Sequence, residues 1–374
     1  MALPGYRSGH EGRPTDVTEG FKPEGRSWAT IFNVVMMIIG SIALAWLLRT
    51  TSWSDLQRVV VGVGAWGGVI FGFEIASMCC DAKAIHTFMQ PEARMVSYLR
   101  VLASYASGRA INVLTPFGAL GEATKVSLLI SHAPKSRVLS SLVLHNLTIL
   151  YLNVAAILLG IPLTLLLLDL PDVVKMFAVI SAAVLVPLMV GLGVIIQRGA
   201  MATVVDLLRQ VRLISADRAT DWRSRLVDVD EHIRELHRQR TKSTRIGMMF
   251  VVAAKLLSWT STMILARAIG VELTPALVVA MLSVGVLIQW ISNIVPLGLG
   301  IADGGSYALY AMVGASGEQG MFVALLSRAR SVSVAVVGLG AMIVLQAQHR
   351  LAHARIHRKI DELKAIQSDS SGST

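Results

Sequence analysis

Two short stretches decide the fold of this 374-residue chain. The first reads NVLTPFGALGE over residues 112–122, and the second reads NIVPLGLGIADGG over residues 293–305. Each contains an Asn, a Pro three or four residues later, two glycines, and an acidic residue beside a Gly. Proline removes a backbone donor, and glycine permits backbone angles that other residues resist. A helix is therefore expected to stop within each stretch and to restart after it.

Both stretches lie inside apolar regions, 95–130 and 275–314, of a very apolar chain. Hydrophobic residues make up 54% of it and charged residues 16%, with a mean hydropathy of +0.62. Soluble domains have about 45–50% hydrophobic residues and about 25% charged residues. An integral membrane protein is therefore predicted. Unpaired backbone groups cannot face lipid, so broken helices at membrane depth are buried in protein or line a watery cavity. Each region is accordingly predicted to be a re-entrant helical hairpin.

The remaining apolar segments are predicted to cross the bilayer, because about 20 apolar helical residues span the hydrocarbon core. The predicted fold is an all-α polytopic membrane protein with about six full spans and two Pro/Gly-broken hairpins that form an inverted repeat. Ordinary kinked spans, eight in total, are the alternative. The six segments are 29–48, 59–80, 138–160, 173–196, 247–269 and 321–345.

Basic residues predict the orientation, because short positively charged loops stay in the cytoplasm. Lys and Arg are densest in 198–245 and recur after residue 345, whereas the connections 161–172 and 270–274 contain none. Both termini are therefore expected in the cytoplasm. The first hairpin then enters from the cytoplasm and the second from outside, as in inverted-repeat transporters, whose binding sites lie at the repeat interface.

This topology divides the chain into five parts. In the basic loop 197–246, apolar residues recur at helical spacing among charged residues, which indicates an amphipathic helix on the headgroups or the bundle. These residues are Leu226, Val229, Ile233 and Leu236. No nucleic acid partner is expected, because acidic residues are interspersed there and Trp222 is its one aromatic residue. The parts are an N-terminal tail (1–28), a first membrane half (29–196), a basic cytoplasmic loop (197–246), a second membrane half (247–346) and a C-terminal tail (347–374).

Charged side chains inside the apolar regions are the candidate site residues. An ionisable group at the bilayer centre costs at least about 2.5–3.5 kcal/mol, so each needs a partner, water or a ligand. Arg109 and Asn112, like Glu122 and Lys125, are three residues apart and share a helix face. The predicted substrate-binding residues are Arg109, Asn112, Glu122, Lys125, Asn293, Asp303, Arg328 and Arg330. The predicted helix-break residues are Pro116, Gly118, Gly121, Pro296, Gly298, Gly300 and Gly304.

Four bases in this set stand against two acids, Glu122 and Asp303. One interpretation is that the two acids neutralise neighbouring bases and fix the hairpins to the bundle. The other is that the surplus bases receive an anionic headgroup, since Arg donates parallel hydrogen bonds to phosphate and helix N-termini add backbone donors. Glu74 and Asp81 are expected near the cytoplasmic end of the second span, with Lys83 as a partner, and receive no role.

At these motifs the sequence resembles the transmembrane flippase-domain family typified by bacterial lysylphosphatidylglycerol synthetases. The resemblance rests on Arg109-Ala-Ile-Asn112 through Pro116, on Gly121-Glu122 and Lys125, and on Pro296-Leu-Gly-Leu-Gly300-Ile-Ala-Asp303-Gly304 followed by Leu326-Ser-Arg328. It covers about residues 59–345. Two positions differ from the family pattern, Lys125 where Arg is usual and Ala302-Asp303 where Arg-Glu is usual.

The resemblance implies a bacterial inner-membrane protein that moves a lipid between leaflets, with membrane lipids as partners. The lipid would be an anionic or modified phospholipid or a hopanoid-related lipid, and a homo-oligomer is left open. Only 346–374 follows the last span, so no aminoacyl-transferase region is expected.

Neither a nucleotide-binding loop nor metal-ligand spacing is present, and Cys79 and Cys80 indicate neither a disulfide framework nor a zinc site. No enzyme activity, cofactor or metal is therefore predicted. Three alternatives stay open: a transporter of a small soluble anion, a membrane-embedded lipid-modifying transferase with Glu122 or Asp303 as general base, and a non-catalytic assembly partner.

Overall fold

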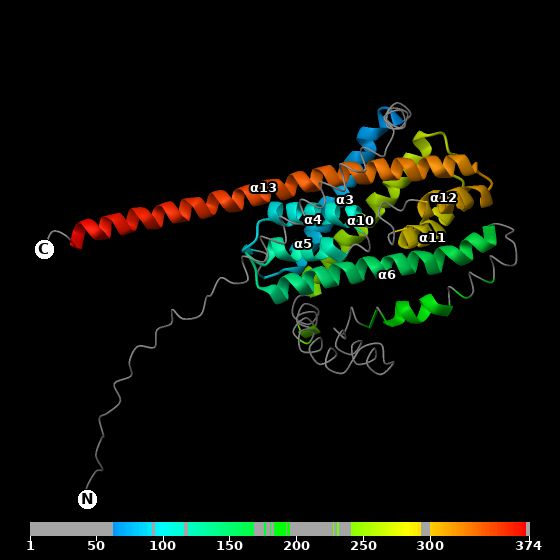
Figure 1. The fold of residues 1–374 in the computed structure, drawn as a ribbon. Coiled ribbons are helices and arrows are strands. Elements are labelled where there is room, and N and C mark those ends of the chain that lie inside the picture. Colours follow the sequence, from blue (N-terminus) through cyan, green and yellow to red (C-terminus); the bar gives the residue numbers. More distant parts are fainter. Residues whose placement is uncertain are drawn as a thin grey trace, which may run out of the picture.

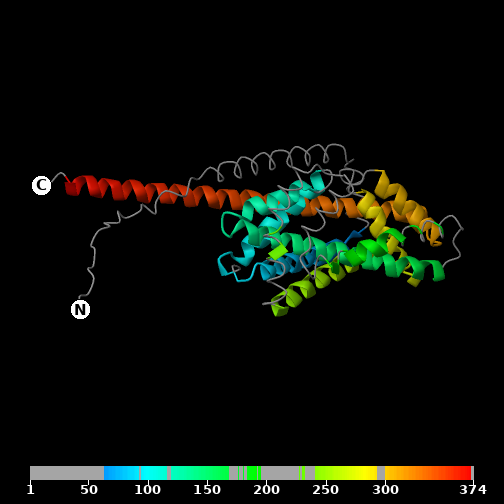
Figure 2. The same ribbon diagram turned by 90° about the horizontal axis from the view of Figure 1, so that it is seen from below.

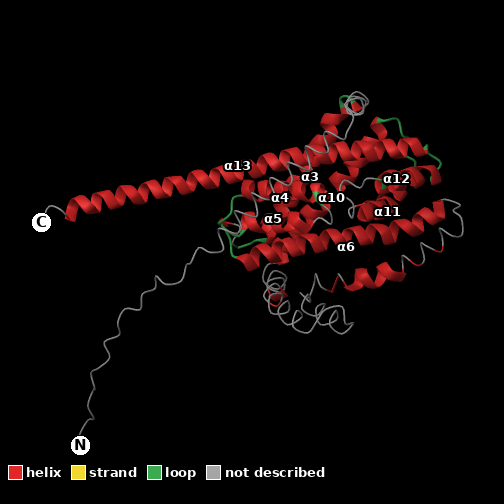
Figure 3. Ribbon diagram, viewed as in Figure 1, coloured by secondary structure: helices red, strands yellow, loops and turns green. Residues whose placement is uncertain are grey.

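The computed structural model describes residues 63–91, 94–115, 119–167, 241–292 and 300–371, together with short pieces between 176 and 231, of which 183–191 is the longest. Within these residues the chain forms helices joined by turns and short connections, without a strand (Figure 3). The predicted all-α class is therefore confirmed for this part of the chain.

The helices of the first half surround the first broken region. Helices α4 and α5 pack against each other, and α4 also packs against α3 whereas α5 contacts α6 (Figure 1). Their bounds are Trp66–Phe88 for α3, Tyr98–Leu114 for α4, Ala119–Leu129 for α5 and Lys135–Leu167 for α6.

The helices of the second half follow the same order of a long helix, two shorter helices and a last long helix. Helix α11 packs on α12 and also reaches α6 of the first half. Their bounds are Thr241–Ala268 for α10, Pro275–Ser292 for α11, Ile301–Met312 for α12 and Gly317–Ser371 for α13.

The first predicted break is present between α4 and α5. Helix α4 ends at Leu114, and its C-cap Thr115 has an extended backbone with φ −121° and ψ 147°. A residue before proline prefers that conformation because the proline ring clashes with a helical neighbour, and Pro116 follows. The next helix starts at Ala119. Residues 116–118, which include Gly118, lie outside the described residues.

The second predicted break separates α11 from α12. Helix α11 ends at Ser292, and α12 begins at Ile301, directly after Gly300 with φ +80°. Only glycine adopts that left-handed conformation without strain. Asn293, Pro296 and Gly298 lie outside the described residues. A pair of helices with a break is thus found in both regions, and the inverted relationship between the pairs stays a prediction.

Four of the described helices are long and apolar enough to cross a membrane: 135–167 (α6), 242–268 within α10, 275–292 (α11) and 317–347 within α13. Three of them closely match the predicted spans 138–160, 247–269 and 321–345. The fourth, α11, was expected to be one limb of a re-entrant hairpin, yet its 18 residues extend about 27 Å, close to the hydrocarbon thickness. Six and eight spans both remain open as predictions.

The structure describes the other predicted spans only in part. Helix α3 overlaps the span expected at 59–80, but it runs on to Phe88 and carries Glu74, Asp81 and Lys83, and it is not among the four described helices that are apolar enough to cross a membrane. The span at 29–48, most of the span at 173–196 and most of the loop at 197–246 lie outside the described residues.

Large apolar side chains lie on the outer faces of the helices. Leu159 and Leu166 of α6 are 75% and 83% exposed, and Met249 of α10 is 69% exposed. A soluble monomer rarely presents such a continuous apolar surface, whereas a bilayer accommodates it. These faces are therefore suited to contact lipid tails.

Three helix pairings hold the halves together: α3 with α10, α4 with α13, and α6 with α11. Helix α3 packs along α10, where Ser77 Oγ donates to the Ala254 carbonyl at 2.9 Å and Ser261 Oγ donates to the Ile70 carbonyl at 3.3 Å. Helix α13 packs along both α4 and α12. It spans 55 residues, about 80 Å, and its C-terminal part extends well past the bundle in both views (Figures 1 and 2). Helix α13 is therefore a common support for the two broken regions.

Candidate functional site

A buried carboxylate on α3, Glu74, is the centre of a charged cluster. Its side chain is 1% exposed and forms an ion pair with Arg109 of α4 through Oε1. Its Oε2 lies 3.8 Å from Nη1 of Arg330 on α13 and accepts no hydrogen bond from the described residues. Arg330 Nη1 also donates to the hydroxyls of Ser261 and Thr262 on α10, at 3.2 Å and 3.3 Å. One carboxylate thus faces two guanidinium groups.

Lys255 of α10 is a third base near this cluster. Its Nζ lies 5.3 Å from the centre of the Trp259 ring, and Asp81 and Arg109 are near enough to act on its charge. Within the described part of the chain, its Nζ forms no ion pair with a carboxylate. A base inside a membrane span without such a partner marks a candidate functional site.

A second buried carboxylate on α3, Asp81, lies two helical turns after Glu74. The hydroxyl of Tyr105 on α4 donates to its Oδ2 at 2.7 Å, and Nε2 of His145 on α6 lies 3.0 Å from its Oδ1. All three side chains are buried, and the Tyr105 and His145 rings meet edge-on with centroids 5.8 Å apart. Asp81 thus connects three helices through polar contacts.

The third carboxylate, Glu122, connects both limbs of the first broken region to α6. Lys125 Nζ lies 2.6 Å from its Oε1, as the shared helix face predicts, and this ammonium also lies 4.7 Å from the centre of the Tyr105 ring. Asn146 of α6 donates from Nδ2 to Glu122 Oε2 at 2.9 Å, and Asn112 of α4 donates to Oε1 at 3.4 Å. Glu122 therefore fixes α5 relative to its neighbours.

Helices α4 and α5 approach each other closely at Gly108 and Gly121. The Gly121 amide donates to Asn112 Oδ1 at 2.8 Å. A Cβ atom at Gly121 would lie 2.0 Å from that oxygen and 2.0 Å from the Gly108 carbonyl oxygen, so no side chain fits. Gly121 lies inside the first turn of α5, and its role there is close packing.

Asp303 holds the start of α12 and contacts α13. Its Oδ2 accepts from the Gly300 amide at 3.0 Å, which caps the helix. Nη2 of Arg328 lies 2.9 Å from each of its carboxylate oxygens. Gly304 follows inside the first turn of α12. Both acidic residues predicted beside the breaks thus neutralise a neighbouring base.

The described break regions and all three carboxylates on α3 and α5 lie within the segment, residues 33–340, that matches one family model, described as lysylphosphatidylglycerol synthase TM region. The chain belongs to this family. The resemblance expected from the sequence is thereby confirmed. No curated protein and no solved structure matches the chain. As a member of the lysylphosphatidylglycerol synthase TM region family, the protein is a multi-pass membrane protein with a function related to membrane lipids.

In this family member, the structure separates the predicted site residues into three groups. Arg109 and Arg330 meet at Glu74, Asn112 and Lys125 meet at Glu122, and Arg328 pairs with Asp303. The last two groups fit the interpretation in which an acid neutralises a base and fixes a broken region to the bundle. The excess of positive charge is therefore concentrated at Glu74, between α3, α4, α10 and α13.

Sequence reasoning named the acids on α3, Glu74 and Asp81, but assigned them no role. Lys83, the expected partner of Glu74 and Asp81, is the wrong residue: its Nζ lies over the Tyr98 ring, 5.5 Å from the centre. A signal for them was available, because residues 74 and 81 are seven apart and share a helix face. Lys255 was detectable as well, as an isolated base within the apolar segment 247–269.

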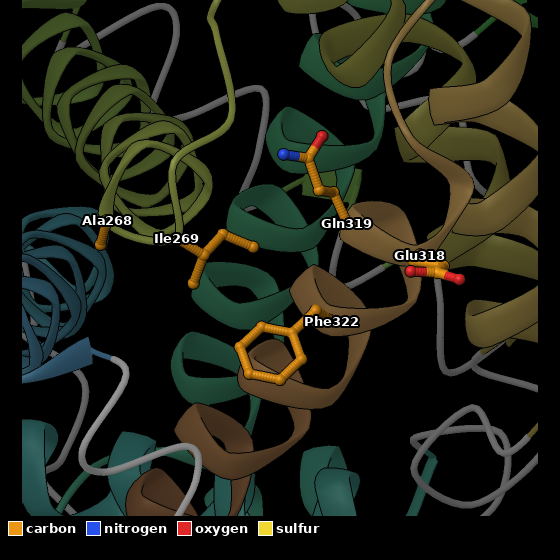
Figure 4. Close-up of a pocket in the computed structure, with 5 residues that line it drawn as sticks. All are labelled: Ala268, Ile269, Glu318, Gln319 and Phe322. Atoms are coloured by element: carbon orange, nitrogen blue, oxygen red, sulfur yellow. The ribbon is translucent and has the colours of Figure 1, made fainter.

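A shallow pocket of about 450 Å³ lies elsewhere, at the end of α10 and the start of α13. Figure 4 shows the Phe322 ring on the side of Ile269 and the Glu318 carboxylate turned away from both. It contains none of the predicted site residues, and we assign it no role. Among the described residues, no group of His, Cys, Asp and Glu side chains could hold a metal ion.

Proposed function

We propose that this protein is a lipid translocase of the bacterial inner membrane, with both termini in the cytoplasm. It moves a lipid with a polar or anionic headgroup between leaflets through a cavity between two inverted repeats. The headgroup enters among the helices, whereas the acyl chains stay in the bilayer. The protein acts as a transporter and not as an enzyme.

The observation that carries this proposal is the imbalance of charge around Glu74. Arg109, Arg330 and Lys255 contribute three positive charges from three helices, and Glu74 contributes one negative charge. Asp81, a further acid whose charge acts on Arg109 and Lys255, is already bound by Tyr105 and His145. Excess positive charge inside a bilayer is unfavourable without an anion, so an anionic group is the expected ligand of this cluster.

A lipid phosphate suits the chemistry of the three bases. Guanidinium groups donate parallel hydrogen bonds to phosphate oxygens, and an ammonium adds a point charge. The Arg109 and Arg330 side chains are 29% and 18% exposed, so each can contact a ligand while Glu74 holds it in place. Family membership and the apolar outer faces favour a lipid over a soluble anion as the source of the phosphate.

Reconstitution into liposomes tests the proposal. We expect the protein to accelerate the exchange of headgroup-labelled anionic or modified phospholipids between leaflets, relative to protein-free liposomes. Uptake of radiolabelled inorganic phosphate into the same vesicles distinguishes transport of a soluble anion from translocation of a lipid. Unchanged exchange across a panel of anionic and zwitterionic lipids would disprove the translocase proposal. Phosphate uptake without lipid exchange would instead favour a transporter of a small soluble anion.

A further inference from the structure

Trp259 of α10 carries a buried hydrogen-bond donor without a partner in the described part of the chain. Its indole Nε1 is shielded from solvent, and no described residue accepts a hydrogen bond from it. A buried indole N–H usually finds an acceptor, because leaving it without one costs free energy. Such a donor therefore needs an explanation, such as strain, a bound water or a ligand.

The place of Trp259 along its helix is also unusual for tryptophan. In membrane proteins tryptophan is enriched at the two membrane–water interfaces, where its N–H reaches polar headgroups. The apolar segment 242–268 of α10 has Lys255 at its centre, and Trp259 follows by about one turn. The indole N–H thus belongs to a residue well inside the segment, where headgroups at the membrane surface do not supply an acceptor.

Trp259 shares a helix face with residues that belong to, or contact, the cluster at Glu74. Lys255, Trp259 and Thr262 follow one another at spacings of four and three residues, which places them on one side of α10. Thr262 Oγ1 accepts from Arg330 Nη1 at 3.3 Å. Along this side of the helix, Trp259 therefore lies between Lys255 and the residue that contacts Arg330.

Lys255 determines which part of the indole a ligand can use. Its Nζ lies 5.3 Å from the centre of the Trp259 ring, within the range of a cation–π contact. Tryptophan rings also bind quaternary ammonium groups of ligands, but here an ammonium of the protein already lies over the ring and repels a second cation. The two side chains together offer N–H donors and positive charge, a combination that recognises an anion and disfavours a cationic headgroup.

We propose that Trp259 is a further ligand-binding residue of the cluster at Glu74, and that its indole N–H donates to the phosphodiester of a lipid whose headgroup carries no cation. This inference rests on the proposed function and narrows its substrate class to phospholipids with a net negative headgroup. A phosphodiester has two non-bridging oxygens, so a single lipid phosphate can accept from the Lys255 ammonium and from the indole together.

NMR of the full-length protein with ¹⁵N-labelled tryptophan, in nanodiscs of phosphatidylcholine, tests the donor without a transport assay. The chain has seven tryptophans, so the Trp259 indole signal is assigned by its absence in Trp259→Phe. Replacing part of the phosphatidylcholine by phosphatidylglycerol should shift the Trp259 indole proton downfield, as a new hydrogen bond does. Trp290 of α11, which packs against an apolar cluster that includes Ile157 and Val286, is the control and should not shift.

A Trp259 indole signal that phosphatidylglycerol leaves unchanged would overturn the proposal. Inorganic phosphate, added to the same nanodiscs, distinguishes a soluble anion from a lipid headgroup. A shift with inorganic phosphate and none with phosphatidylglycerol would also overturn the proposal, because the ligand would then be soluble.

Liposome exchange tests whether the donor serves binding of the lipid. Trp259→Phe removes the N–H and keeps an aromatic ring beside Lys255. The membrane content of phosphatidylglycerol that gives half-maximal exchange should therefore rise about tenfold, the effect of one charge-assisted hydrogen bond, with a maximal rate near that of the wild type. Trp290→Phe makes the same change in an apolar surrounding and should match the wild type.

Equal half-maximal contents of phosphatidylglycerol in Trp259→Phe and the wild type would overturn the role of Trp259 in binding. Absence of lipid exchange in every protein would instead reject the proposed function and leave the NMR result standing.

Discussion

Glu74 of α3 and Arg109 of α4 form an ion pair in which the carboxylate is 1% exposed and the guanidinium side chain 29% exposed. The acid is thus shielded from its surroundings and the base is accessible. Because Arg330 lies at the second carboxylate oxygen, Glu74 orients two bases without neutralising both. This arrangement distinguishes a site that can receive an anion from a closed ion pair.

Arg109→Gln is expected to lower thermal stability, because it deprives a buried carboxylate of its main partner. Breaking such a pair typically costs about 3–5 kcal/mol. The double variant Glu74→Gln/Arg109→Gln should recover a substantial part of this loss, because the buried carboxylate is removed together with its main partner. Thermal unfolding in nanodiscs measures the stability of the single and the double variant. Strictly additive losses would show that the two side chains are not coupled.

Gly121→Ala is expected to destabilise the packing of α4 on α5. The added Cβ would lie 2.0 Å from the Gly108 carbonyl oxygen, which is backbone and cannot move aside freely. Overpacking of this kind costs about 1–3 kcal/mol. Gly68→Ala in α3, where no atom lies within 4 Å of the added Cβ, is the matched control. The account of this contact fails if the unfolding temperatures of the two variants are equal.

Asp303 has two roles that substitution can separate. Asp303→Asn keeps an oxygen that can accept from the Gly300 amide but loses the charge that faces Arg328, whereas Asp303→Ala loses both. The alanine variant should therefore be less stable than the asparagine variant by the value of a helix cap, about 1 kcal/mol. Chemical unfolding in detergent compares them, and equal stabilities would contradict the capping role.

Opposed orientation of the two broken regions predicts labelling from opposite sides. Single cysteines at Ala119 and Ala302, in a background without Cys79 and Cys80, place a thiol just after each break. Gly300 itself is avoided because its φ of +80° disfavours any side chain. We expect a membrane-impermeant maleimide to label one cysteine from each side of oriented vesicles. Labelling of both from the same side would exclude the inverted repeat.

The sequence predicted the broken helices well because proline and glycine act locally. Pro116 forces its predecessor Thr115 into an extended conformation whatever surrounds it, and Gly300 supplies a left-handed angle. The ion pair of Glu122 and Lys125 could be predicted equally well, since residues three apart in a helix share a face.

Contacts between distant helices were not predictable in the same way. Residues 74 and 109, or 81 and 145, meet only because α3 packs against α4 and α6, and no local pattern encodes that packing. Lys83 was chosen as a partner for being near in sequence, whereas the side chains that bind Asp81 come from two other helices.

Lipid exchange by Lys255→Gln is the most direct test of an anion site at Glu74. The Lys255 Nζ has no carboxylate partner among the described residues, so its removal leaves no acid unpaired and should not lower the unfolding temperature. Loss of a charge-assisted contact is worth about 1.5–3 kcal/mol, so exchange of an anionic lipid should fall about tenfold or more. Arg267→Gln, at the exposed end of the same helix, should exchange at the wild-type rate. An unchanged exchange rate in folded Lys255→Gln would contradict the account.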